Sequence, residues 1–142
     1  MMHEIIIKGK TYDGMWVEGA YYHAKKYYGD PDDKHCIIPT AESLDYEQAL
    51  EYFIVDPATV GRYTGLKDRD GKRIFEGDIV KAQDDLIFSP FCDGLVGKVV
   101  YSEAAFFIEP KDPTKSEYLF NECAVYEVLG NIHDNPELME VR

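Results

Sequence analysis

The sequence predicts a mostly β fold, a β-rich α+β chain in which helix is scarce. Short runs of β-branched and aromatic residues recur along the chain, and Gly, Asp, Asn and Pro separate them at close spacing. This pattern is typical of domains built from many short strands. The 142 residues are 45% hydrophobic, which is enough for a real core. We expect a small N-terminal β unit over residues 1–49 and an SH3-like barrel over residues 50–142, with one compact domain as the alternative.

Strands are expected wherever such a run is bounded by turn residues. Their ranges are 4–10, 15–22, 36–38, 51–55, 62–66, 79–80, 96–101, 105–109, 118–120 and 124–131, with a further short one around 86–88. The first two are expected to form a hairpin. Ser102-Glu103 predicts a tight turn between the strands that lie on either side of it.

Helix is expected only as one or two turns at a time. Residues 40–50 fit either one or two helical turns or a loop. Asp56-Pro57 and Asn135-Pro136 each place an N-cap residue before a proline at the first helical position, which predicts one helical turn at each. Residues 82–94 and 110–115 have the composition of loops.

The most explicit stretch is residues 60–81, VGRYTGLKDRDGKRIFEGDIVK. Within it, Asp70-Gly71 is a strong signal for a hairpin turn, because glycine takes the positive φ that such a turn needs at low steric cost. Gly77 interrupts the next apolar run, and we expect it to turn the chain at the corner of the barrel. Asp78 beside it is expected to bond backbone amides. Gly71, Gly77 and Asp78 are therefore predicted to be structural residues.

Several motifs of this stretch occur in order with others nearer the C-terminus. They are VGRYTGLKD at residues 60–68, DGK at 70–72, EGDIV at 76–80, GKVVY at 97–101, FFI at 106–108, YEVLGNI at 126–132 and NPEL at 135–138. In this order they resemble the YopX family, small proteins of phages and prophages. The resemblance covers roughly residue 52 to the C-terminus and is looser before it. It implies a phage or prophage accessory protein and carries over no catalytic residue.

The chain is acidic, with a net charge of -12 and a pI near 4.6. A nucleic-acid-binding domain usually shows the opposite balance. The acidic surface either keeps the protein soluble or imitates DNA toward a basic partner. No apolar run approaches the ~18 residues of a membrane span, and the N-terminus lacks the features of a signal peptide. The odd set Cys36, Cys92 and Cys123 predicts reduced, separate thiols in the cytoplasm.

The densest cations of the chain flank the predicted hairpin turn, and they are Arg62, Lys67, Arg69, Lys72 and Arg73. Tyr63 and Phe75 lie close to them in the sequence, so this hairpin could contact phosphate and stack a base. Residues 77–99 also resemble the small SH3-like barrels that include RNA-binding KOW segments. The alternative is a solvated hairpin tip whose charges are offset by Asp68 and Asp70.

Neither a metal site nor a catalytic site is expected. The candidate metal ligands, which show no C-x₂-C or H-x₃-H spacing, are His3, His23, His35, Cys36, Cys92, Cys123, His133 and Asp134. Residues 68–71, DRDG, begin like a calcium loop but lack its remaining ligands. Glu76 and Asp78 could act as an acid–base pair, but no phosphate loop, nucleophile elbow or cysteine–histidine motif accompanies them. We expect no cofactor and no enzymatic activity.

Aromatic residues are frequent in the N-terminal part, where Trp16 and the doublet Tyr21-Tyr22 fall on a predicted strand. Neighbours on a strand point to opposite faces, so one tyrosine of the doublet should lie outside the core. Tyrosine and tryptophan are favoured at protein interfaces, with core packing or edge exposure as the alternative. Trp16 and Tyr22 therefore join the hairpin cations and Tyr63 as candidate interaction residues.

Two functions follow. The first hypothesis is a non-enzymatic accessory protein that binds a host or phage protein, with a homo-oligomer left open. The second is a nucleic-acid-associated factor that uses the basic hairpin over residues 62–73. No membrane partner is expected.

Overall fold

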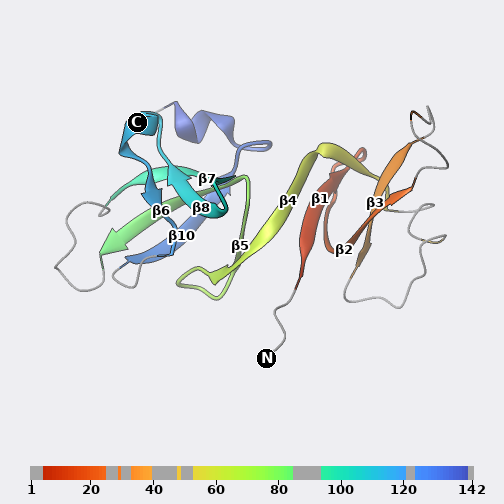
Figure 1. Cartoon of the computed structure of the whole chain (residues 1–142), viewed down its shortest axis with the longest axis horizontal. Helices are drawn as coiled ribbons and strands as arrows, with labels where there is room; N and C mark the ends of the chain where they lie inside the picture. The colour runs from red at the N-terminus through yellow and green to blue at the C-terminus, as the bar shows by residue number, and fades with distance from the viewer. Residues whose placement is uncertain are drawn as a thin grey trace. The chain divides into compact units, whose positions relative to one another are not determined.

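A computed structural model gives the protein as a mostly β chain, which confirms the predicted fold class (Figure 1). It describes residues 5–24, 29, 33–39, 48, 53–84, 94–120 and 124–140. The chain divides into two compact units, Met1–Tyr63 and Thr64–Arg142. The division falls inside strand β4 (Val55–Lys67), and the predicted division after residue 49 stays a prediction. No helix within the described ranges is long and apolar enough to cross a membrane.

The first unit contains an antiparallel sheet in the order β3-β2-β1-β4. Its strands are β1 (Ile7–Thr11), β2 (Trp16–Ala24), β3 (Lys34–Pro39) and the first part of β4. β1 and β2 form the predicted hairpin. The β-branched residues Val17, Ile37 and Val55 are 5% exposed or less and form a core against which Phe53 and Val60 pack. Burial of these side chains is the main term that stabilises the sheet.

The predicted helical turn at Asp56-Pro57 is wrong, because β4 runs through it. The Asp56 carboxylate accepts the Ala58 N–H at 3.0 Å, which satisfies a local donor without a helix. The Thr59 hydroxyl donates to the Asp56 carbonyl at 2.6 Å and accepts the Lys10 N–H at 2.8 Å. The register between β1 and β4 shifts beside this point. The Asx turn therefore lies where the pairing of β1 with β4 is irregular, because the side-chain-to-N–H bond typical of an N-cap also forms outside helices.

The second unit contains an antiparallel sheet in the order β10-β6-β7-β8-β9. Its strands are β6 (Asp78–Asp84), β7 (Val96–Ser102), β8 (Ala105–Glu109), β9 (Glu117–Tyr118) and β10 (Ala124–Asn131), while β5 (Arg73–Phe75) lies beside the end of β4. The buried core consists of Ile74, Val80, Ala82, Val99, Ile108, Leu119 and Tyr126. This arrangement is compatible with an SH3-like barrel, and that finer assignment stays a prediction.

Two predicted boundaries in the second unit are wrong by a few residues. β6 continues to Asp84, where a loop was expected to begin after Lys81. The turn between β7 and β8 has Glu103 and Ala104 at its centre, one residue later than predicted, with φ of 51° and 64°. Positive φ at both central residues defines the turn that matches the twist of a hairpin. The interpretation of residues 40–50, of which only residue 48 is described, and that of a strand at 86–88 fall outside the described residues.

Gly77 turns the chain between β5 and β6, as predicted, with φ of 93°. Its N–H donates to the Val99 carbonyl at 2.9 Å, and its carbonyl accepts the Ile132 N–H at 2.9 Å. Asp78 is 2% exposed and accepts the Phe75 N–H at 2.8 Å, which is the predicted structural role. The corner is therefore fixed by backbone hydrogen bonds on both sides.

The end of β10 explains the spacing of the last motifs. A Cβ atom at Gly130 would lie 2.4 Å from the Asn135 side-chain oxygen, so a larger residue there would have to displace the Asn135 side chain. Asn135 also donates its N–H to the Asn131 carbonyl at 2.8 Å. The 3-10 helix η2 (Pro136–Met139) follows at once and confirms the helical turn predicted there. A second 3-10 helix, η1 (Pro113–Lys115), lies within the predicted loop after β8.

Candidate functional site

The loop that joins β4 to β5 is organised around the side chain of Asp68. The Asp68 N–H donates to the Lys72 carbonyl at 2.7 Å, and the Gly71 N–H returns to the Asp68 carbonyl at 3.0 Å. One oxygen of the Asp68 carboxylate accepts the N–H groups of Asp70 and Lys72, both at 2.9 Å. Gly71 takes a φ of 84°, as predicted for this turn. The loop is therefore closed by its own backbone and by one acidic side chain.

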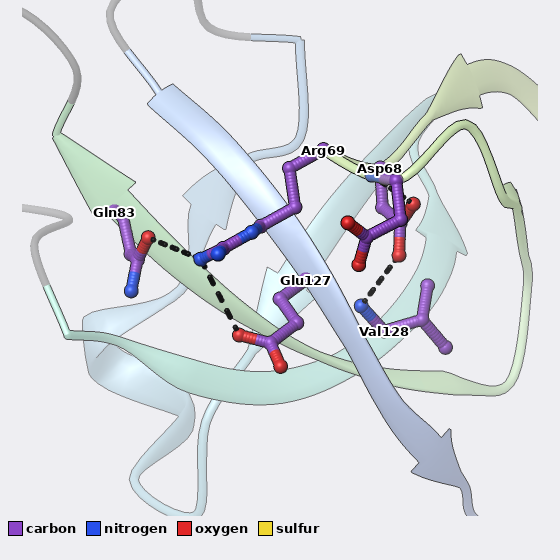
Figure 2. A network of polar contacts seen from close by, with 6 residues as sticks. Asp68, Arg69, Gln83, Glu127 and Val128 are labelled. Atoms are coloured by element: carbon purple, nitrogen blue, oxygen red, sulfur yellow. Dashed lines mark hydrogen bonds and ion pairs between the residues drawn. The ribbon is translucent and has the colours of Figure 1, made fainter.

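The same carboxylate binds a strand that is remote in the sequence (Figure 2). Its second oxygen accepts the Val128 N–H of β10 at 3.1 Å, and the Arg69 N–H donates to the Tyr126 carbonyl at 2.9 Å. Burial alone would raise the pKa of Asp68, but the N–H groups of Val128, Lys72 and Asp70 and the nearby Lys72 charge lower it overall. Asp68 is thus an ionised, 8% exposed clamp that holds the loop on β10.

The Arg69 side chain extends across β10 on its outer surface, as Figure 2 shows. Its Nη1 donates to the Gln83 Oε1 atom of β6 at 3.2 Å and lies 3.8 Å from the Glu127 Oε2 atom. The Arg69 and Glu127 side chains are 49% and 40% exposed, so water weakens this ion pair. The guanidinium keeps donors available on an exposed surface.

A cavity of about 570 Å³ opens next to this loop. Its walls come from the β4–β5 loop and from the chain around β10, and they are formed by Leu66, Lys67, Asp68, Arg69, Phe120, Ala124, Val125 and Tyr126. We call this the β10 groove. The Tyr126 hydroxyl donates to the Leu119 carbonyl at 2.6 Å and so fixes the residue before Phe120. The Phe120 side chain is 57% exposed, which leaves an aromatic ring available at the groove.

The structure separates the predicted hairpin cations into groups. Lys67, Arg69 and Lys72 are exposed on the β4–β5 loop or beside it, and Arg73 is half-buried at the start of β5. Arg62 is exposed and Tyr63 is half-buried, both in the first unit.

One part of the nucleic-acid interpretation is wrong. Phe75 is 2% exposed in the second unit, so its ring is not available to stack a base. The apolar run that ends in Phe75 supplies core residues, because Ile74 before it is fully buried as well.

A comparison with known protein families finds a match over most of the chain. The family model described as YopX protein matches residues 10–140. The chain belongs to the YopX family. The match begins well before the motifs that carry the sequence resemblance, so it includes the first unit of this YopX-family chain. No curated protein matches it.

The predicted aromatic candidates of the first unit lie on β2. The Trp16 ring is half-buried, and the Lys8 ammonium lies 4.8 Å from its centroid, within the range of a cation–π contact. Tyr21 and Tyr22 are 39% and 40% exposed, so both tyrosines of the doublet reach solvent. In the register of β2 with β3 the two tyrosines lie opposite Ile37 and Cys36, which are fully buried, so the exposed doublet lies beside the core.

Sequence reasoning named Lys67 and Arg69 of the β10 groove as candidate interaction residues but missed the apolar residues that line it. Phe120 and Val125 were included only as members of short strands, and nothing local marks them as a site. Alternation along β10 does carry a signal, since Tyr126 is buried while Val125 on the other face is half-buried. The groove itself requires the pairing of two distant segments.

A second cluster lies in the first unit: His23 and His35, both named from the sequence as candidate metal ligands, meet Asp33, and the sequence did not indicate that these three would come together. His23 of β2 stands opposite His35 of β3 in the strand register, and Asp33 precedes β3. His23 contacts the Asp33 carboxylate, and the Tyr21 hydroxyl contacts His35. Burial and the neighbouring His23 lower the pKa of His35, although Asp33 opposes this. Burial, together with Asp33, raises the pKa of Tyr21.

Proposed function

We propose that this YopX-family chain is a non-enzymatic phage or prophage accessory protein that acts in the cytoplasm by binding another protein. The β10 groove is the binding site. Its occupant is an extended segment of a host or phage protein, with an apolar anchor and an acidic residue beside it. The anchor packs against Phe120 and Val125, and the acidic residue meets Lys67 or Arg69.

The observation that carries this proposal is the exposed ring of Phe120 at a groove that also holds two exposed cations. Binding sites combine apolar and aromatic walls with a few polar groups that fix orientation. Aromatic residues and arginine are enriched at protein interfaces. The acidic side chains of the corner and the loop, Asp78 and Asp68, are engaged by backbone N–H groups, which supports a structural role for them.

The test is capture of a partner from the host cell by the tagged full chain, with and without nuclease. Phe120→Ala and Lys67→Glu should each reduce capture of the same partner protein at least about tenfold, since hot-spot truncations cost about 2 kcal/mol. Tyr118→Ala is the matched control, because Tyr118 is an exposed aromatic residue that does not line the groove. Capture that is lost on nuclease treatment, or that is unchanged in both groove variants, would rule this site out.

The second candidate is a nucleic-acid-associated factor, and it is favoured by the exposed Lys67, Arg69 and Lys72 on one loop. The net charge of -12 opposes it, because the remaining surface repels a polyanion within a Debye length of about 8 Å. We expect no measurable affinity for duplex or single-stranded DNA at physiological salt. Micromolar binding that falls steeply with salt, and that disappears when the three cations become Ala, would favour this second function instead.

A further inference from the structure

The side chains of His23, Asp33 and His35 converge at the end of the β2–β3 hairpin where β2 ends and β3 begins. Direct pairing of His23 with His35 in the antiparallel register places both imidazoles on one face of the sheet. Their ring centroids are 4.2 Å apart with an interplanar angle of 12°. A nitrogen of each ring and a carboxylate oxygen of Asp33 all lie within 4.8 Å of one another. On this face of the sheet the side chains therefore change from apolar at Ile37 to potential metal ligands at His35.

The chemistry of this set matches a divalent transition metal. Two imidazole nitrogens and one carboxylate oxygen form the protein ligand set of many zinc sites that keep a position open. Two ligand atoms of a tetrahedral zinc ion lie about 3.4 Å apart, so the widest spacing here must close by up to about 1.4 Å. One of the two stacked imidazoles must also turn, so that the lone pairs of both rings meet at the ion. The His23 and Asp33 side chains are 33% and 36% exposed, so both have room for that rotation.

We propose that His23, Asp33 and His35 bind one zinc ion, with a water molecule or the Tyr21 hydroxyl in the remaining position. This site lies in the first unit and is independent of the β10 groove. It replaces the expectation of no metal, which rested on spacing within short segments of the sequence. The ion joins β2 to the residue that precedes β3, and it therefore stabilises this end of the hairpin.

The experiment is a titration of the purified metal-free full chain with zinc, followed by calorimetry and by native mass spectrometry. The expected result is one equivalent bound with a dissociation constant in the micromolar range or below. His35→Ala and Asp33→Asn should each weaken binding at least about tenfold, since loss of even an outer partner of a metal ligand costs 10–100-fold. His133→Ala is the matched control, because it removes a histidine of the second unit, and it should bind zinc like the unchanged protein.

Cobalt substitution identifies the ligand atoms. Visible bands of a Co²⁺ complex that has nitrogen and oxygen ligands are expected, and they should be lost in His23→Ala and His35→Ala. A thiolate-to-metal charge-transfer band would assign the ion to a cysteine and overturn the proposal. So would zinc binding below one tenth of an equivalent, or binding that is unchanged in Asp33→Asn and His35→Ala while circular dichroism shows that both variants are folded.

Discussion

Two loops of this chain share the same local hydrogen bonds but differ in their contacts to the rest of the protein. Thr11-Tyr12-Asp13-Gly14-Met15 joins β1 to β2, and Asp68-Arg69-Asp70-Gly71-Lys72 joins β4 to β5. In each, the first N–H donates to the last carbonyl, at 2.8 Å and 2.7 Å, and the glycine N–H donates to the first carbonyl at 3.0 Å. In each, the last N–H donates to the first side chain at 2.9 Å. The glycines have φ of 97° and 84°.

The difference lies in the second acceptor atom of the first residue. The Thr11 hydroxyl also donates to Asp13 inside its own loop, and the tip residue Tyr12 is 73% exposed. The Asp68 carboxylate has a second oxygen that reaches Val128, 60 residues away. A carboxylate can therefore close a turn and dock it on a strand at the same time. The comparison indicates that the turn is a local property, whereas its docking is a property of the second unit.

The largest expected effect comes from removing the clamp. Asp68→Ala should destabilise the protein by about 2–4 kcal/mol, because it leaves the partly buried N–H groups of Asp70, Lys72 and Val128 without their acceptor. Thr11→Ala should cost about 1 kcal/mol, because both side-chain hydrogen bonds that it removes lie inside its own loop. Chemical denaturation of both variants measures the difference. Equal costs would show that the docking contributes nothing.

Asp68→Thr separates closure of the turn from its docking on β10, because it gives the β4–β5 loop the side-chain acceptor that Thr11 provides in the β1–β2 loop. The Lys72 N–H keeps a side-chain acceptor, and the Val128 N–H loses its own. Amide hydrogen exchange should therefore speed up at Val128 and stay slow at Lys72. Equal acceleration at both amides would contradict a separate docking contact.

The glycines give the next largest effect. Gly77→Val should destabilise by well over ~1 kcal/mol, because a β-branched residue is strained at a positive φ and both neighbouring hydrogen bonds prevent relaxation. Gly71→Ala and Gly14→Ala should cost less and about the same as each other, because a Cβ atom meets no other atom within 4 Å at either position. A thermal melt of the three variants ranks them. An unchanged midpoint for Gly77→Val would remove the corner assignment.

The two loops also show how far the sequence predicts this protein. Both turns can be predicted from the sequence, because an Asp-Gly pair indicates a turn by itself, without residues elsewhere in the chain. The clamp of Asp68 on Val128 is not readable, since nothing near Asp68 specifies its distant partner. The wrong prediction at Asp56 has the same origin. An acidic side chain that accepts a nearby N–H can begin a helix or can lie in an irregular strand. Here pairing with β1, which the local sequence does not specify, determines that the segment is a strand. The family motifs in contrast gave the family directly, because they combine such local signals in a fixed order.

The two loops also differ in charge, which makes the contribution of Asp68 to stability depend on pH. The pKa of Asp68 is lower in the folded protein than in the unfolded chain, so its ionisation favours folding. That contribution is complete above about pH 4, the range of an unperturbed Asp, and is lost as the pH falls through the lowered pKa. The stability deficit of Asp68→Thr should therefore shrink in acid. Thr64→Val is the control, because Thr64 donates to the Ile74 carbonyl at 2.8 Å without a titrating group. A deficit of Asp68→Thr that is independent of pH would contradict the lowered pKa.

The smallest expected effect concerns Arg69, and it separates stability from binding. Its backbone N–H holds the Tyr126 carbonyl whatever the side chain is, so Arg69→Ala leaves the docking intact. The lost contacts to Glu127 and Gln83 are exposed, and exposed ion pairs contribute about 0–1 kcal/mol. Arg69→Ala should therefore change the unfolding free energy by no more than about 0.5 kcal/mol, and less at high salt because ions screen the pair.

The same variant removes a cation from the β10 groove and should weaken capture of the partner protein. Asp68 would then stabilise the loop, and the Arg69 side chain would contact the partner protein. A large loss of stability in Arg69→Ala, measured by denaturation at low and high salt, would show instead that the arginine is part of the clamp.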